Sequence, residues 1–558
     1  MNNYSIADNF SLLAKLMDIH QENSFKAKSY SIAAYTVEKL TVELSTIDQN
    51  KIFSLKGIGE SVGHKIVEQL QTGSLKILED YIAKTPQGVL EMLHIKGIGP
   101  KKIATIWHEM GIENLGELLY ACNENRLTLF KGFGEKTQQG VKEAIEFYMG
   151  TQGSYLYQQI ENYVFTIDEK LNLIFPDSIH ALTGTFRRQL EIIEKLEWVT
   201  TADISEIKSF FITNDFKIVT EENGYICFVG KENVTLGFYS IEETFFYNQL
   251  FVTSCSDEFL QSWINNTGWD ITQPYQSEEE IFEASNCAFI PICLRESGSV
   301  ISNALQQKLP VLIKQQDIKG IIHSHSRWSD GMNTIEEMAA ACIEQGFEYL
   351  VMSDHSKTAS YAQGLPIEKV LAQHDLIDAL NKKNAPFRIF KSIESDILGD
   401  GSLDYDENIL SKFDIVIASI HSNLKMTEDK AMLRLMNAIE NPYTSVLGHM
   451  TGRLLLSRNG YPIDHKKIIE ACAANDVVIE LNAHPRRLDI DWRWINYALK
   501  KNVLISINPD AHSIDGFNDC KYGVLVAQKA GLTKEQNLSS FKLTEFESFL
   551  VRQHQKRG

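Results

Sequence analysis

The chain has 558 residues and a formal net charge of −19 at pH 7, a length that predicts three or four domains. Its eight cysteines show no Cys-x-x-Cys spacing, and the sequence contains neither a secretory signal nor an apolar run of about 18 residues. These features argue against a disulfide-stabilised secreted protein and a membrane-spanning one, so we expect a cytoplasmic protein with no membrane partner.

Three similar hairpins recur in the first 150 residues, each reading hydrophobic-Lys-Gly-hydrophobic-Gly at the start of an expected helix. The copies are Leu55–Gly59, Ile95–Gly99 and, less regularly, Phe130–Gly134. Glycines in such a turn let backbone N–H groups and the helix N-terminus approach a phosphate closely. A single Gly-x-Gly is common in ordinary tight turns, but three copies favour the helix-hairpin-helix motif, which contacts nucleic-acid backbones without reading sequence. The residues expected at DNA are Gly57, Gly59, Lys65, Gly97, Gly99, Lys101, Gly132 and Gly134.

The charge of this region predicts only modest affinity for DNA. Residues 1–150 contain 16 Lys and Arg against 18 Asp and Glu, a net charge of −2, so the other 408 residues carry −17. DNA binding should therefore rest on local contacts by the hairpins and weaken as salt rises. In the third copy, Phe133 is also compatible with a simple role in the core.

Seven short apolar runs in the C-terminal half each end in side chains that bind metals. The first ends in His323 and His325, with Asp330 in an Asp-Gly turn beyond, and alternate residues on a strand point to the same face. Helical spacing separates the runs, as in 334–346 and 428–439. Strands that alternate with amphipathic helices predict a parallel sheet closed as a barrel, whose strand ends meet at one mouth. The other six runs end in Asp354-His355, Glu394-Ser-Asp396, His421, His449, Glu480-Leu-Asn482 and Asp510-Ala-His512.

These strand ends predict a metal site rather than a set of core histidines. A lone His on an apolar strand is more often a core residue, but ten of the 15 histidines follow position 320, and six of those ten lie at strand ends. Imidazole and carboxylate ligands without cysteine favour Mn or Zn, with Fe as a further candidate. Nine candidate ligands exceed what one ion needs, so we expect two or three divalent ions, and phosphoester hydrolysis is the favoured reaction class.

From near position 315 to its end the sequence resembles the polymerase and histidinol phosphatase (PHP) domain. The likeness is carried by His-x-His, Ser-Asp-Gly, Asp-His, a lone Glu, Ser-x-His, Gly-His and Asp-Ala-His. The resemblance implies a distorted seven-stranded barrel with three Mn or Zn ions, bridged by Glu394. Arg453 and Arg487 lie in motifs that also match and are candidate phosphate contacts, for which a surface salt bridge is the alternative. The implied metal ligands are His323, His325, Asp330, His355, Glu394, His421, His449, Asp510 and His512.

The two halves together resemble the bacterial family X DNA polymerases, in which a DNA polymerase beta-like core is fused to a PHP domain. Residues 9–34 are similar to the family's 8-kDa DNA-binding domain, and 277–296 are similar to the end of its thumb. By the same resemblance, Lys65 aligns with the lysine that forms a Schiff base with an abasic sugar in members with lyase activity. A phosphate-contacting or merely exposed lysine is the alternative that we favour.

The central segment departs from this family where polymerase chemistry is expected. Family members read approximately Gly-Ser-x-Arg-Arg, six residues and Gly-Asp-x-Asp, whereas this chain has Gly184–Arg188 followed by Lys195 and Glu197 at the two Asp positions. The third acidic position is occupied by Thr235. Because nucleotidyl transfer needs carboxylates to hold two Mg ions, these changes predict a polymerase fold without polymerase activity. A different register with Asp203 as a ligand is the alternative, although no Asp-x-Asp occurs between 150 and 255.

The expected fold is an all-α helix-hairpin-helix region, a central α+β nucleotidyltransferase palm and thumb, and a C-terminal distorted (β/α)7 barrel. The expected domains are 1–85, 86–150, 151–310 and 311–558. Together they predict a Mn- or Zn-dependent DNA phosphodiesterase, a 3'-5' exonuclease that acts at ends, gaps or primer termini in DNA repair. The alternatives are a small-molecule phosphatase resembling histidinol phosphatase, a DNA-binding scaffold without activity, and a repair polymerase that is still active.

Overall fold

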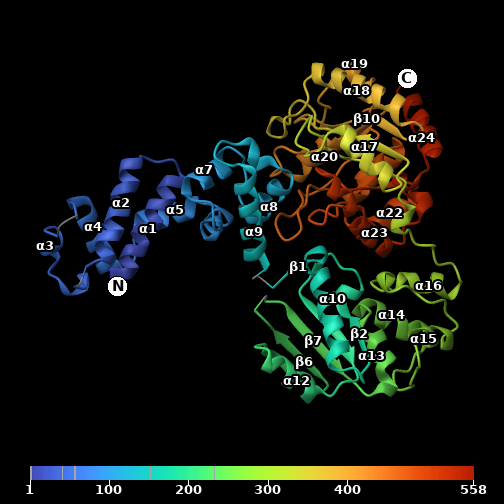
Figure 1. Cartoon of the computed structure of the whole chain (residues 1–558), viewed down its shortest axis with the longest axis horizontal. Coiled ribbons are helices and arrows are strands. Elements are labelled where there is room, and N and C mark those ends of the chain that lie inside the picture. The colour runs from blue at the N-terminus through green and yellow to red at the C-terminus, as the bar shows by residue number, and fades with distance from the viewer. Residues whose placement is uncertain (1–2, 41, 56–57, 151–152, 232, 558) are drawn as a thin grey trace. The chain divides into compact units, whose positions relative to one another are not determined.

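Figure 1 shows the computed structural model of the chain, which describes residues 3–40, 42–55, 58–150, 153–231 and 233–557. The chain forms two compact units, Met1–Tyr148 and Met149–Gly558. The division into four domains remains a finer prediction within these units. Across the described ranges, no helix is both long enough and apolar enough to cross a membrane.

The described residues of the first unit form helices, as expected for a helix-hairpin-helix region. Its first two helices pack against each other through Phe10 and Tyr30, whose rings stack with their centroids 5.7 Å apart. A helix begins directly after the last glycine of each hairpin, which is Gly59, Gly99 or Gly134. The main helices are α1 (Asn3–Ile19), α2 (Ser24–Glu38), α4 (Glu60–Thr72), α5 (Lys76–Lys84), α7 (Pro100–His108), α8 (Leu115–Asn123) and α9 (Glu135–Gly150).

Two of the hairpin turns use glycine because their backbone is left-handed. The φ angle is 98° at Gly97 and 95° at Gly132, a region that strains residues with a side chain. The apolar residue between the two glycines of each hairpin is buried, which anchors the turn on the core: these residues are Ile58, Ile98 and Phe133. Phe133 therefore has the core role that its sequence position suggested.

The second unit begins with a five-stranded sheet that α10 (Tyr157–Ile174) and α12 (Ile204–Thr213) cover on one face (Figure 1). The strand order is β2-β4-β7-β6-β5, and β4 and β7 are its one parallel pair among the described strands. Trp198 and Phe238 face the helices and stack with centroids 5.6 Å apart. The strands are β2 (His180–Thr183), β4 (Lys195–Thr200), β5 (Lys217–Glu222), β6 (Tyr225–Val229) and β7 (Thr235–Ser240).

A helical thumb-like region follows the sheet and is built around Arg295. Its guanidinium is fully buried, lies over the rings of Phe251 and Phe282, and donates to Glu278 at 2.6 Å. The ion pair and the aromatic rings satisfy a charge that would otherwise be costly to bury. The helices are α13 (Phe246–Thr253), α14 (Asp257–Thr267), α15 (Glu278–Ala284) and α16 (Ser299–Leu305).

The C-terminal region is a parallel barrel of seven strands in sequential order, from β8 to β14. A parallel bridge between Ser324 and Ala511, just beyond the first and last strands, brings the two edges together and nearly closes the barrel. The strands are β8 (Gly320–Ile321), β9 (Tyr349–Met352), β10 (Arg388–Asp396), β11 (Ile415–Ser419), β12 (Val446–Leu447), β13 (Val478–Asn482) and β14 (Ile505–Asn508). The surrounding helices are α17 (Ile335–Glu344), α18 (Ile367–Asn384), α20 (Glu428–Glu440), α21 (His465–Ala474), α22 (Trp492–Lys500) and α23 (Cys520–Lys529).

The last helix, α24 (Leu543–Gln555), closes the end of the barrel where the strands begin. Its Phe546 stacks on Tyr349 with centroids 4.5 Å apart and packs in one apolar cluster with Phe390 and Ile415. Apolar packing therefore fills the amino ends of the strands, and the polar side chains lie at their carboxyl ends.

Candidate metal centre

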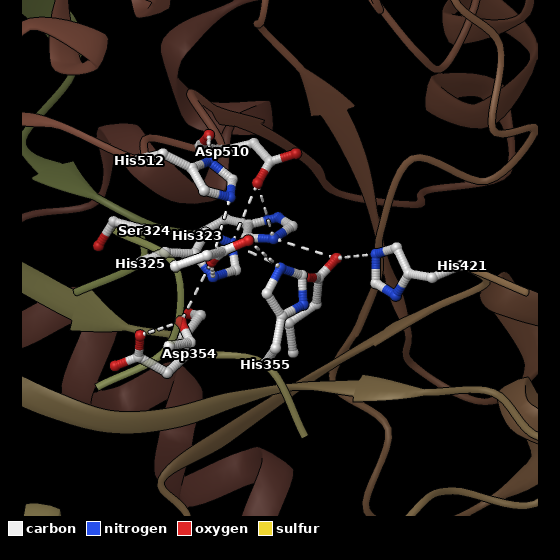
Figure 2. A network of polar contacts seen from close by, with 12 residues as sticks. His323, Ser324, His325, Asp354, His355, His421, Asp510 and His512 are labelled. Atoms are coloured by element: carbon white, nitrogen blue, oxygen red, sulfur yellow. Dashed lines mark hydrogen bonds and ion pairs between the residues drawn. The ribbon is translucent and has the colours of Figure 1, made fainter. Parts of the chain in front are cut away.

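The side chains expected to bind metal gather at the carboxyl ends of the barrel strands. Figure 2 shows several of them pointing toward one another: His323, His325, His355, His421, Asp510 and His512. They form three groups whose ligand atoms lie within 4.8 Å of one another: His325, Asp330, His355 and His512; His323, His325 and Asp510; and His355, Glu394 and His421. Because the groups share members, they adjoin, as sites for two or three neighbouring ions would.

Glu394 lies at the centre of this cluster. Its Oε1 is 2.9 Å from Nε2 of His449, 3.1 Å from Nε2 of His421 and 3.2 Å from Nε2 of His323. Its Oε2 is 2.9 Å from Nδ1 of His355. One carboxylate thus contacts histidines that follow four different strands. With His449 beside Glu394, all nine residues predicted as ligands lie in one cluster.

The first histidine pair reaches the cluster by a route that strand alternation did not anticipate. β8 ends at Ile321, and His323 has a left-handed backbone with φ 64°. The N–H of His325 then donates to the carbonyl oxygen of Ala511 at 2.8 Å. The two rings do converge, with centroids 5.3 Å apart, but a kink held by the segment after the last strand brings them together. His323 and His325 therefore lie side by side as predicted, but the cause is this kink and not the alternation of side chains along a continuous strand.

Burial and neighbouring charges set the protonation of the cluster. Burial and the nearby imidazole of His512 lower the pKa of His325 to about 3, so its ring is neutral. Burial alone would raise the pKa of Glu394, but His421 and His323 hold the pKa well below its usual range. Against the effect of burial, the neighbouring carboxylates raise the pKa of His323, His355 and His421, so these imidazoles carry protons that binding of a divalent cation would displace. Imidazoles mixed with ionised carboxylates are the donor set that divalent transition metals favour.

Two buried nitrogen atoms also fit a metal site. Among the described residues, Nε2 of His323, although 3.2 Å from Oε1 of Glu394, makes no contact of hydrogen-bond geometry, and neither does Nδ1 of His325. Buried polar atoms in folded proteins are almost always paired, and a divalent cation would satisfy both. The residues present therefore fit divalent metal ions.

Two carboxylates at the ends of predicted strands orient histidines that are predicted to bind the metal. Nδ1 of His323 lies 2.6 Å from Oε2 of Glu480, and Nδ1 of His421 lies 2.6 Å from Oδ1 of Asp396. Each contact fixes the ring so that Nε2 faces the cluster. Both acids lie at the ends of predicted strands, as the predicted ligands do. Position at a strand end therefore indicates that a residue belongs to the site, but it does not distinguish a supporting residue from a ligand.

Asp354 supports the loop that carries Asp330. It accepts hydrogen bonds from the backbone N–H of Ser326 at 2.8 Å, from Oγ of Ser329 at 2.5 Å and from Nε2 of Gln373 at 2.6 Å. Burial raises the pKa of Asp354, although these donors oppose the rise. This acid is fully engaged in holding the loop, which explains why it directly precedes a predicted ligand, His355, without joining the cluster.

The two predicted arginines lie in different surroundings. Nε of the buried Arg487 is 3.7 Å from Oδ2 of Asp510, so its guanidinium reaches the metal cluster. Arg453 donates from Nη1 to Asp491 at 2.6 Å, from Nε to the carbonyl of Arg487 at 3.0 Å, and from Nη2 to the carbonyl of Leu488. All three nitrogens of Arg453 contact protein, which favours a supporting role over contact with a phosphate.

In the palm, Lys195, Glu197 and Thr235 occupy neighbouring positions on the parallel pair β4 and β7. Lys195 lies opposite Thr235 in the register. Nζ of Lys195 is 2.7 Å from Oε1 of Glu197, and the Tyr239 hydroxyl donates to the same oxygen at 3.0 Å. The carboxylate of Glu197 is thus held by protein groups.

The paired arginines of the same region are also engaged. Arg187 donates to Oγ of Ser254 at 2.6 Å and to Glu278 at 2.5 Å. Arg188 donates from Nε to Glu296 at 2.9 Å. Both guanidiniums therefore join the palm to the thumb.

The hairpin residues lie at the helix starts of the first unit. Gly57 lies outside the described residues. Lys65 forms an ion pair with Glu68 at 2.7 Å, with 30% of its side chain exposed, and Lys101 is exposed on α7. The remaining five hairpin glycines have open space where a Cβ would stand, which leaves room for a ligand to approach: Gly59, Gly97, Gly99, Gly132 and Gly134.

Comparison with known families agrees with this architecture. Residues 1–75 match the helix-hairpin-helix domain, and residues 89–146 match the SAM-like helix-hairpin-helix tandem. Residues 322–484 match the PHP domain.

Two kinds of relative are similar to the chain. A probable phosphatase of Thermoanaerobacter sp. (strain X514) is 28% identical over 229 residues, covering 39% of this chain and 89% of the relative. The DNA polymerase/3'-5' exonuclease PolX of Bacillus subtilis (strain 168) is 31% identical over 577 aligned positions, which cover 97% of this chain and 98% of the relative. Similarity over almost the whole of both chains, with helix-hairpin-helix and PHP matches in the same order, shows that the chain belongs to the bacterial family X DNA polymerases that carry a PHP domain.

Proposed function

We propose that this protein is a metal-dependent 3'-5' exonuclease that removes nucleotides from DNA ends during repair and no longer synthesises DNA. The observation that carries the proposal is the position of Glu394 among four histidines, at 2.9 to 3.2 Å. A carboxylate shared in this way is suited to bridge adjacent metal ions in a phosphoesterase site.

The nine clustered side chains would hold the metal, with Mn or Zn as the proposed ion and Fe as a further candidate. Bound there, two or three divalent ions would provide a hydroxide near neutral pH and neutralise the phosphodiester and its leaving oxygen. The protein supplies a buried cluster, so each charge interaction acts with little screening by water.

Arg487 is the proposed contact for a non-bridging phosphate oxygen. It is buried within reach of Asp510, and its planar guanidinium suits phosphate. Burial and the guanidinium of Arg487 also lower the pKa of His449, so this positive charge acts on the cluster itself.

DNA is the proposed substrate because of the first unit. Helix starts preceded by open glycine turns suit a sugar-phosphate backbone without sequence preference. The relative from Bacillus subtilis, which matches these hairpins as well as the barrel, is named a DNA polymerase and 3'-5' exonuclease. Ends, gaps and primer termini are the DNA structures that we propose.

Loss of polymerase activity is the second part of the proposal. The positions that align with the three catalytic acids carry Lys195, Glu197 and Thr235, and a lysine ammonium at 2.7 Å already neutralises the one carboxylate. A cation in place of a metal-binding carboxylate opposes the binding of Mg²⁺. Lys65 is proposed as a phosphate contact, in line with its partly exposed ion pair.

A phosphatase acting on phosphomonoesters is the rival function, because a relative named a probable phosphatase matches 39% of this chain over 89% of its own length. The test incubates the purified chain and Mn²⁺ with a 5'-labelled primer annealed to a template, and in parallel with the same primer carrying a 3'-phosphate. Shortening of the primer, absent in His323→Ala/Glu394→Ala and retained in Lys501→Ala on the barrel exterior, supports the exonuclease. Removal of the terminal phosphate without shortening would favour the phosphatase.

A further inference from the structure

The palm contacts the barrel through Glu191, which directly follows the loop with the paired arginines. Its carboxylate is buried and accepts from Nη1 of Arg493 at 3.0 Å and from Nε1 of Trp492 at 3.3 Å. Both donors lie at the start of α22 in the barrel. Glu191 is thus a buried acid of the palm whose partners both belong to the metal-binding region.

From this contact, a series of ion pairs and hydrogen bonds extends toward the metal centre. Nη1 of Arg493 also lies 3.0 Å from both oxygens of Asp491. Asp491 accepts from Arg453 at 2.6 Å, and Arg453 donates to the backbone carbonyls of Arg487 and Leu488. The guanidinium of Arg487 then faces Asp510 at 3.7 Å. Every link from the palm to the proposed phosphate contact is therefore a direct polar contact.

This series of contacts depends on the positive charge of Arg493. Its Nη1 lies between two carboxylates, those of Glu191 and Asp491. Without a cation between them, two neighbouring acids repel each other, and the acid that is free to turn moves away. Asp491 caps α22 by accepting from the N–H of Arg493 at 2.9 Å and also holds Arg453, so its displacement would release the backbone at Arg487.

Apolar packing holds the same two segments together. Leu190 and Tyr157 of the palm line one crevice with Pro485 and Leu488 of the barrel. Leu488 is 3% exposed and directly follows Arg487 in the chain. Arg453 thus binds the backbone of the loop that carries Arg487, and the palm packs against the side chains of Pro485 and Leu488 in the same loop.

Two lysines of α23 also fix the palm and thumb on the barrel. Lys529 of α23 has a fully buried side chain and donates to Glu296 at 3.0 Å and to the carbonyl of Arg188 at 2.7 Å. Lys521 donates to Glu161 of α10 at 2.6 Å. The charged side chains of Arg187, Arg188 and Glu191 thus all contact the thumb or the barrel.

We infer that the palm of this protein acts as a positioning element of the metal centre, with Glu191 and Arg493 as positioning residues that set the place of Arg487. This inference rests on the proposed phosphoesterase function. It assigns the polymerase scaffold a task in hydrolysis: to hold the loop that presents Arg487 beside Asp510. A shift of about 1 Å in such a group lowers a rate by up to about a hundredfold, so loss of the contact should lower turnover and leave the metal ligands in place.

The test compares Glu191→Ala, Glu191→Gln and Arg493→Ala with the wild-type chain in Mn²⁺. The readouts are kcat and KM for primer shortening, bound Mn per chain, DNA affinity, and affinity of the Mn-loaded protein for inorganic phosphate. Glu191→Ala and Arg493→Ala should lower kcat about tenfold and weaken phosphate binding, with Mn content and DNA affinity within about twofold of wild type. Glu191→Gln should recover most of the loss, because its amide oxygen still accepts from Arg493. Lys208→Ala, which removes an exposed ion pair of the palm, is the matched control.

Unchanged kcat and phosphate affinity in Glu191→Ala and Arg493→Ala, with or without a lower melting temperature, would overturn the inference and leave the contact a purely stabilising one. If Glu191→Ala does not fold, Arg493→Ala decides the matter, because 54% of that side chain is exposed and its loss leaves no buried cavity. If the wild type leaves DNA intact, the exonuclease proposal fails by itself. The phosphate affinities of the variants then still decide the positioning role.

Discussion

Nδ1 of His323 lies 2.6 Å from the carboxylate of Glu480, so the ring presents its other nitrogen to the metal cluster. We predict that Glu480→Gln lowers the affinity for Mn²⁺ about 10- to 100-fold, because an uncharged partner orients the imidazole less firmly and lowers its basicity. Titration with Mn²⁺ measures the change, and Glu470→Gln on the exposed exterior of the barrel is the control. Equal affinities of the two variants would contradict the supporting role of Glu480.

Removal of the metal should destabilise the barrel. The carboxylates and imidazoles of the cluster would then face one another without the ions that they fit, and a ligand at about 100 times its dissociation constant stabilises the folded state by about 2.7 kcal/mol. Thermal unfolding before and after chelation should therefore show a fall in melting temperature that added Mn²⁺ reverses. Glu394→Ala should show almost no response to Mn²⁺, and a full response in that variant would place the ions elsewhere.

The hairpin glycines should control DNA affinity. Gly97→Ala and Gly132→Ala force a side chain into a left-handed backbone, at a cost of about 1–2 kcal/mol, and distort the turn that faces DNA. We expect the double variant to bind a primer-template at least about fivefold more weakly at low salt, with Mn content unchanged. Gly111→Ala is a matched control, because Gly111 has φ 68°, faces open space and lies outside the hairpins. A loss of affinity of the same size in the control would assign the effect to folding.

The palm should not extend a primer. The experiment uses the His323→Ala/Glu394→Ala variant, so that hydrolysis cannot erase the product, and supplies all four deoxynucleotides with Mg²⁺ or Mn²⁺. No extension is expected, because the proposed alignment puts Lys195, which pairs with Glu197, at the position of a metal-binding acid. The PolX protein of Bacillus subtilis serves as the comparison enzyme. A ladder of extended products from this chain would show that another register of acids, such as one with Asp203, supports polymerisation.

Local patterns identified the two kinds of site because each motif is short. A ligand at the end of an apolar run and a glycine turn before a helix are formed by residues close in sequence, so their spacing alone places them at strand ends and helix starts. The same locality explains the wrong expectation about β8. A pleated strand through His323 and His325 is the default, whereas the kink at φ 64° depends on Ala511, which follows the last strand and accepts a hydrogen bond from the N–H of His325.

The sequence by itself determined that His323, Glu394 and the other seven predicted ligands share one mouth, because parallel strands end on the same side of a barrel. Only the tertiary structure decided which groups support them. Glu480 meets His323 across 157 residues and Glu191 meets Arg493 across 302, and at such separations no local spacing tells a ligand from a supporting acid. Burial, charge pairing and the packing of the palm on the barrel make that choice, since an acid that pairs with an arginine or orients an imidazole is no longer free to bind a metal.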